Sequence, residues 1–121
     1  MIIVIIKFVI YTKTLNNMPD KRLEDLKDLI HEIKHLNFMQ AIAWLKTERK
    51  KSEMEGNPDE RNLKKIKFIH LLDVLYAGIP PKSYYNEQEI KKYLIPLFKK
   101  YVAHDEDKHG YFSSWIDLYE R

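Results

Sequence analysis

No cysteine occurs among the 121 residues of the chain, and glycine is scarce, with three residues. The lack of cysteine excludes disulfide bonds, thiolate zinc sites and cysteine nucleophiles. It fits a reducing compartment, so we expect a cytoplasmic protein. Isoleucine and lysine are abundant instead. This bias is typical of A/T-rich genomes, and it points to a phage, another mobile element or a low-GC bacterium as the source.

The chain also lacks a long hydrophobic run. Its most apolar stretch, MIIVIIKFVIYT at residues 1–12, is shorter than the roughly twenty residues that cross a bilayer, and Lys7 lies within it. It has neither a preceding basic region nor a small-residue cleavage site, so it does not match a signal peptide. Its β-branched residues favour a strand over residues 1–13 that is apolar on both faces, with a short buried helix as the alternative.

A strand at the N-terminus would need hydrogen-bond partners along its edges. The sequence offers no second convincing strand, because two prolines interrupt residues 79–85. Antiparallel pairing of residues 2–10 from two chains across a twofold axis would supply those partners, which leads to the hypothesis of a homodimer. A buried helix, or contact with the helix predicted at 58–77, would also hide the segment.

The remainder of the chain has the composition of a globular protein, with 45% hydrophobic and 32% charged residues. Asn37, Asn57 and Asn86 each precede Gln or Glu by three residues, which is the pattern of a capping box at a helix start. Pro96 falls within an apolar face that continues across it, which favours a kinked helix over two separate ones. Apolar spacing predicts helices over residues 20–36, 38–55, 58–77, 87–103 and 113–120.

These observations predict one domain over residues 1–121, with an apolar N-terminal segment at 1–13 and a helical bundle at 20–120. The predicted fold class is mainly α, a small bundle of four to five helices with one N-terminal β-strand or short buried helix.

The sequence HEIKH at residues 31–35 matches the H-E-x-x-H pattern of zinc proteases, in which two histidines bind zinc and the glutamate is the general base. In such an enzyme His31 and His35 would be the zinc ligands and Glu32 the catalytic residue. The apolar residues of the helix predicted at 20–36 lie nearly opposite both histidines, however, so the histidines should face water. No candidate third ligand lies in a recognisable motif. A zinc-dependent hydrolase is therefore the alternative hypothesis.

Two further patterns have both a chemical and a structural interpretation. The stretch DEDKHGYFSSWI at 105–116 resembles the first half of an EF-hand calcium loop, with Asp105, Asp107 and Gly110 at positions one, three and six. Ile116 stands where a bidentate glutamate is needed, and an acidic turn with a left-handed glycine explains the same residues. His70 and Asp73 are one helical turn apart, and we expect a structural hydrogen bond from this pair rather than an acid/base couple.

Positive charge is concentrated around the connection between the helices predicted at 38–55 and 58–77. Eight cations stand there against five acidic residues, an excess equal to the net charge of +3 of the whole chain. Such a hairpin suits phosphates or an acidic protein surface, although a solvated hairpin with internal ion pairs such as Glu60–Lys64 is also compatible. The tyrosines Tyr84 and Tyr85 follow two prolines, in a loop where aromatic residues often anchor partners. The predicted partner-binding residues are Lys46, Arg49, Lys50, Lys51, Arg61, Lys64, Lys65, Lys67, Tyr84 and Tyr85.

The sequence therefore predicts a small binding or regulatory protein without catalytic activity. Its partner is expected to be a nucleic acid or a protein of acidic character, contacted through the basic hairpin. No cofactor is expected under this hypothesis, whereas the hydrolase alternative requires zinc.

Overall fold

The computed structural model describes residues 21–120. Within this range the chain forms helices and no strand, which confirms a mainly α fold. None of these helices combines the length and the apolar character needed to cross a membrane. The strand or buried helix predicted at 1–13 and the dimer contact predicted at 2–10 lie outside the described residues.

The helices follow the predicted order closely. They are α2 (Lys21–Ile33), α3 (Phe38–Ser52), α4 (Pro58–Leu75), the 3₁₀ turn η1 (Pro81–Ser83), α5 (Glu87–Glu89), the π-helical turn η2 (Ile90–Leu94), α6 (Ile95–Ala103) and α7 (Tyr111–Tyr119).

The predicted capping residues mark the starts of three helices. The side chains of Asn37 and Asn86 accept from the backbone N–H three residues later, and Gln40 and Glu89 accept in return, so both capping boxes are complete. Asn57 accepts from the Glu60 N–H at 2.9 Å and is followed by Pro58 in the first turn of α4. These local hydrogen bonds explain why the helix starts could be predicted accurately.

Residues 87–103 form one continuous helical run, as predicted, although its geometry changes along its length. The Ile95 N–H donates to the Ile90 carbonyl, five residues earlier, so the turn immediately before Pro96 is π-helical. A proline lacks an N–H and crowds the carbonyl four residues before it, and a wider turn accommodates both effects.

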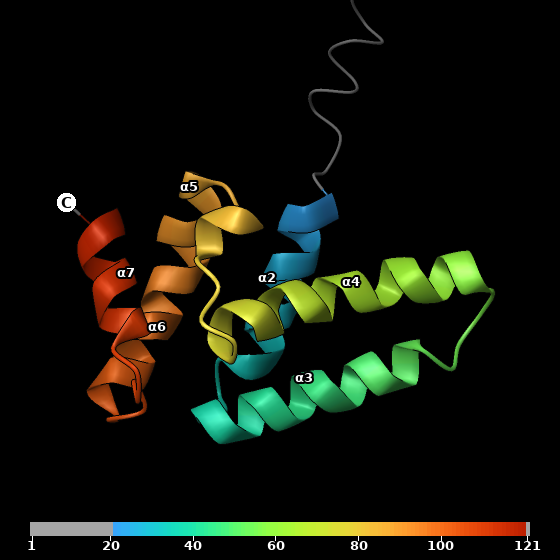
Figure 1. The fold of residues 1–121 in the computed structure, drawn as a ribbon, viewed down its shortest axis with the longest axis horizontal. Helices are drawn as coiled ribbons and strands as arrows, with labels where there is room; N and C mark the ends of the chain where they lie inside the picture. Colours follow the sequence, from blue (N-terminus) through green and yellow to red (C-terminus); the bar gives the residue numbers. More distant parts are fainter. Residues whose placement is uncertain (1–20, 121) are drawn as a thin grey trace, which may run out of the picture.

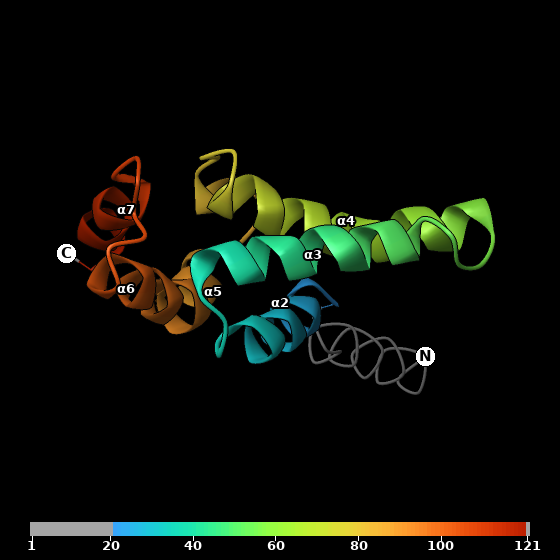
Figure 2. The ribbon, with the colours of Figure 1, turned by 90° about the horizontal axis from the view of Figure 1, so that it is seen from below.

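The helices enclose a single apolar core. Figures 1 and 2 show α3 and α4 side by side along the long axis of the molecule, with α2 packed across them and α6 and α7 at one end. Leu26, Leu29 and Ile33 of α2 are buried, which confirms the predicted apolar face of this helix. At the end formed by α6 and α7, the Phe98 and Phe112 rings stack with centroids 5.0 Å apart and join these two helices.

Candidate functional site

The predicted basic residues lie on a helical hairpin made of α3 and α4 (residues 38–75), here named the basic hairpin. Its two helices run antiparallel, and the connecting segment at residues 53–57 lies at the end farthest from α6 and α7 (Figures 1 and 2). Every residue from 53 to 60 is exposed. The hairpin end therefore extends beyond α2 and meets solvent from all sides among the described residues.

The eight cations of the basic hairpin fall into two groups by exposure. The exposed cations are Lys46, Lys50, Lys51 and Lys64. The half-buried cations are Arg49, Arg61, Lys65 and Lys67. The first group is directly available to a partner, whereas the second is partly covered by neighbouring side chains.

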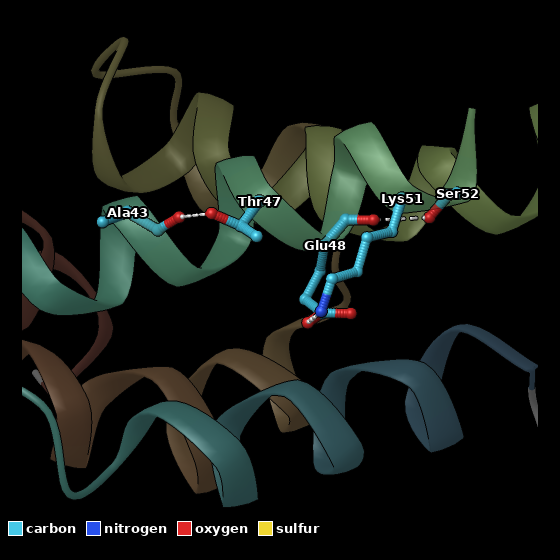
Figure 3. Close-up of polar contacts among 5 residues, drawn as sticks. All are labelled: Ala43, Thr47, Glu48, Lys51 and Ser52. Carbon is cyan, nitrogen blue, oxygen red and sulfur yellow. Dashed lines mark hydrogen bonds and ion pairs between the residues drawn. The ribbon is translucent and has the colours of Figure 1, made fainter. Parts of the chain in front are cut away.

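Three of these cations form ion pairs with acidic residues of the hairpin itself. Lys51 pairs with Glu48 at 3.3 Å, as Figure 3 shows. Lys64 and Lys65 reach back across the connection to acidic residues of the preceding segment, at 3.8 Å from Glu55 and 3.9 Å from Glu53. All three pairs are partly solvated, so each is expected to contribute little to stability.

Two hydroxyl groups of α3 bond to the helix backbone. The Ser52 Oγ donates to the Glu48 carbonyl at 2.8 Å, and the Thr47 Oγ donates to the Ala43 carbonyl at 2.9 Å (Figure 3). Ser52 is buried, so this bond satisfies a hydroxyl that the hairpin core would otherwise leave without a partner.

Tyr84 and Tyr85 lie away from the hairpin end. The Tyr84 hydroxyl donates to Asp73 Oδ2 at 2.7 Å, near the C-terminal end of α4. Tyr85 is buried, with 6% of its surface exposed, so its ring belongs to the core. Asp73 is twelve residues along α4 from Arg61, or about 18 Å at the rise of an α-helix. The predicted partner-binding residues therefore do not form one continuous site.

His70 and Asp73 take structural roles in the same region. Asp73 accepts the hydrogen bond from Tyr84, and the His70 ring stacks on the Tyr84 ring with centroids 4.3 Å apart. Asp73 thus ties α4 to the loop that follows it, and not to a neighbouring helix as the structural interpretation predicted. Burial lowers the pKa of His70 from its ordinary value, and the nearby Asp73 carboxylate offsets part of this effect.

The HEIKH residues face solvent, as their position opposite the apolar face predicts. His31, Glu32 and His35 are all exposed. Helix α2 ends at Ile33, so His35 lies in the turn beyond it. The Lys100 ammonium donates to the carbonyls of Lys34 and Leu36 on either side of His35. Between residues 21 and 120, no group of three or more His, Asp or Glu side chains is placed to hold a metal ion.

Two carboxylates of the 105–116 loop, those of Glu106 and Asp107, serve as helix caps. Both oxygens of Asp107 accept from the start of α7, at 3.1 Å from the Phe112 and Ser113 backbone N–H groups. Glu106 Oε2 accepts from the Phe38 N–H at the start of α3, also at 3.1 Å. Gly110 has φ +72°, which confirms the predicted left-handed glycine. These contacts give Glu106 and Asp107 structural roles at helix starts.

One surface feature was not predicted from the sequence. A hollow of about 460 Å³ lies where the start of α3, the end of α4 and the loop before α7 meet. Its rim carries three exposed apolar residues, Met39, Tyr76 and Tyr111. The Lys46 ammonium lies 4.3 Å from the centre of the Tyr76 ring. The three residues are far apart in sequence, so only the fold brings them together.

No protein-family model, no curated protein and no solved structure matches the chain.

Proposed function

We propose that the chain is a small cytoplasmic binding protein with a regulatory role, which contacts an acidic partner through the basic hairpin. The observation that carries the proposal is the placement of four exposed lysines, Lys46, Lys50, Lys51 and Lys64, on a hairpin whose end extends beyond α2. Solvated ion pairs within the hairpin do not cancel its excess positive charge. That excess would attract and orient an acidic surface during encounter.

An acidic protein is a better partner for this surface than a nucleic acid. Five carboxylates are interspersed among the cations, and they would repel a phosphate backbone laid over the hairpin end. A protein surface can instead present both signs of charge in a matching pattern. Met54, which is 84% exposed in the connecting segment, adds a side chain of a type enriched in protein interfaces. The zinc-dependent hydrolase keeps the HEIKH pattern as its support, but His31, Glu32 and His35 are exposed and no third ligand is placed with them among residues 21–120.

The proposal is tested by affinity capture from the source organism with the full chain as bait. The hairpin variant carries Lys50, Lys51, Lys64 and Lys65 replaced by alanine. The control variant carries the same loss of charge outside the hairpin, at Lys27, Lys34, Lys91 and Lys108, all of which are exposed. We expect the unmodified chain and the control variant to retain the same acidic protein and the hairpin variant to lose it. Equal retention by both variants would refute the proposal.

A second measurement separates the two kinds of acidic partner. Fluorescence anisotropy with a labelled DNA duplex reports nucleic-acid binding directly. If DNA is the partner, the logarithm of affinity should fall with the logarithm of salt at a slope of about −0.9 for each phosphate contacted. The hairpin variant should then bind every sequence more weakly. Absence of binding at low salt would leave the protein surface as the partner.

A further inference from the structure

An apolar groove runs between the start of α2 and the middle of α4, here named the α2–α4 groove. Its lining includes Leu26 of α2, Leu63, Ile66 and His70 of α4, and Tyr85. Leu63 and Ile66 remain 70% and 41% exposed. Residues 63, 66 and 70 recur at the spacing of a single helix face, so they form a continuous strip along α4.

The size of the groove indicates what kind of group occupies it. Its volume is about 170 Å³, whereas pockets that enclose small-molecule ligands measure roughly 300–1,000 Å³. A groove of this size and mainly apolar lining suits a row of aliphatic side chains laid along α4.

The chain itself contains such a row at residues 2–10, here named the N-terminal segment. Its sequence is IIVIIKFVI, in which Lys7 is the one charged residue. Left in water, this apolar surface would be costly, at about 25 cal/mol for each square ångström. The N-terminal segment and the groove therefore each carry apolar surface that the other could cover.

The connection between the two is short in sequence. Lys21 and Arg22, the first residues of α2, line the groove. Ten residues separate Ile10 from Lys21, and a fully extended chain of that length spans up to about 36 Å. The strip from residue 63 to residue 70 is about 10 Å long at the rise of an α-helix. The N-terminal segment can therefore reach every part of the groove, and its attachment gives it a high effective concentration there.

We propose that the N-terminal segment of the same chain docks in the α2–α4 groove and covers Leu63 and Ile66. The docking rests on the apolar match and the tether, and it does not depend on the function proposed for the basic hairpin.

Engineered cysteines test this docking, since the natural chain has none. One cysteine replaces Ile5 or, in a second variant, Ile6, because adjacent residues present opposite faces of an extended segment. The other is Leu63→Cys, at an exposed position where replacement leaves the core intact. The matched control is Asn62→Cys, which is exposed on the same helix but does not line the groove.

Under mild oxidation of the full chain, we expect a disulfide within one molecule, detected by intact mass and non-reducing electrophoresis. It should form roughly tenfold faster with Leu63→Cys than with Asn62→Cys, as a docked population of about ten to one requires. Equal rates at the two positions would overturn the proposal, since they would report random collisions. Disulfides mainly between two molecules would also overturn it and assign the groove to the N-terminal segment of a second copy.

Discussion

Gly78 and Gly110 both adopt left-handed backbone conformations, with φ of +73° and +72°, but their surroundings differ. A Cβ at Gly78 would lie 2.6 Å from the Tyr111 ring, whereas a Cβ at Gly110 would meet nothing within 4 Å. At Gly110 only the backbone conformation therefore disfavours a side chain. At Gly78 a side chain is disfavoured both by the backbone conformation and by the neighbouring Tyr111 ring.

This difference leads to a paired prediction. Gly110→Ala should lower the free energy of unfolding by about 1 kcal/mol, the cost of a left-handed conformation for an L-residue. Gly78→Ala should lower it by about 1 kcal/mol more, because the Tyr111 ring must also move. Urea unfolding of the two variants and the unmodified chain measures both values. Equal losses would mean that the Tyr111 ring yields at no cost.

The environment of His70 predicts a dependence of stability on pH. Burial lowers the pKa of His70, so the unfolded chain binds the proton more tightly than the folded chain. The contribution of neutral His70 to the free energy of unfolding is fully present above the pKa of the unfolded chain, about 6.5. This contribution falls as the pH drops from about 6.5 toward the lower pKa of the folded chain.

His70→Gln removes this contribution while it leaves the other four histidines in place. Between about pH 7.5 and about pH 5.5, the unmodified chain should lose more unfolding free energy than the variant, because only the unmodified chain titrates at this position. Urea unfolding at both pH values gives the comparison. A loss of the same size in both proteins would contradict the link to His70.

At the scale of elements, the helix starts depend on side-chain caps, and α7 shows this most directly. The N-cap position of α7 is Gly110, which has no side chain to accept a hydrogen bond. Asp107 takes over this role and accepts from the Phe112 and Ser113 N–H groups and from the Ser113 hydroxyl. Its carboxylate also lies near the positive end of the helix dipole.

Asp107→Ala should therefore destabilise the protein by about 1–2 kcal/mol, within the range measured for lost helix caps. Asp105→Asn is the matched control, because Asp105 has φ +56° and asparagine tolerates that conformation. Thermal unfolding compares the two.

Since both oxygens of Asp107 are occupied by α7, added calcium should leave the melting temperature of the unmodified chain unchanged. A clear rise with calcium would contradict the capping role.

For the whole molecule, the buried apolar residues of the described range form one core cluster. It extends from Leu26 in α2 to Tyr119 in α7. The last two helices join it through stacked and edge-to-face aromatic contacts, including Phe38 against Tyr101 at 5.4 Å. Such a core should fold cooperatively by itself.

We therefore expect removal of residues 1–13 to leave the helices intact. The shortened chain should keep its helical circular dichroism and a cooperative thermal transition, with a lower melting temperature if the N-terminal segment covers the α2–α4 groove. Loss of the cooperative transition would show that the core requires the deleted residues.

Local signals in the sequence were sufficient to predict the helices. Asn37, Asn57 and Asn86 determine where α3, α4 and α5 begin, because a cap acts on N–H groups two or three residues away. The apolar period likewise predicted the buried face of α2. The exposure of His31 and Glu32 followed from the same period, since it depends only on their angle from that face.

Contacts between distant segments required the tertiary structure. The sequence placed Tyr84 and Tyr85 together as candidate anchors, yet the fold buries Tyr85 and engages Tyr84 with Asp73. Lys64 was expected to pair with Glu60, one helical turn away, but it lies near Glu55 across the hairpin connection. Met39, Tyr76 and Tyr111 meet around one hollow only because three helix ends converge there. The sequence by itself determined the features that depend on residues within one or two helical turns, such as helix caps and buried faces. The tertiary structure decided which side chains meet across longer separations, because those contacts depend on how the helices pack.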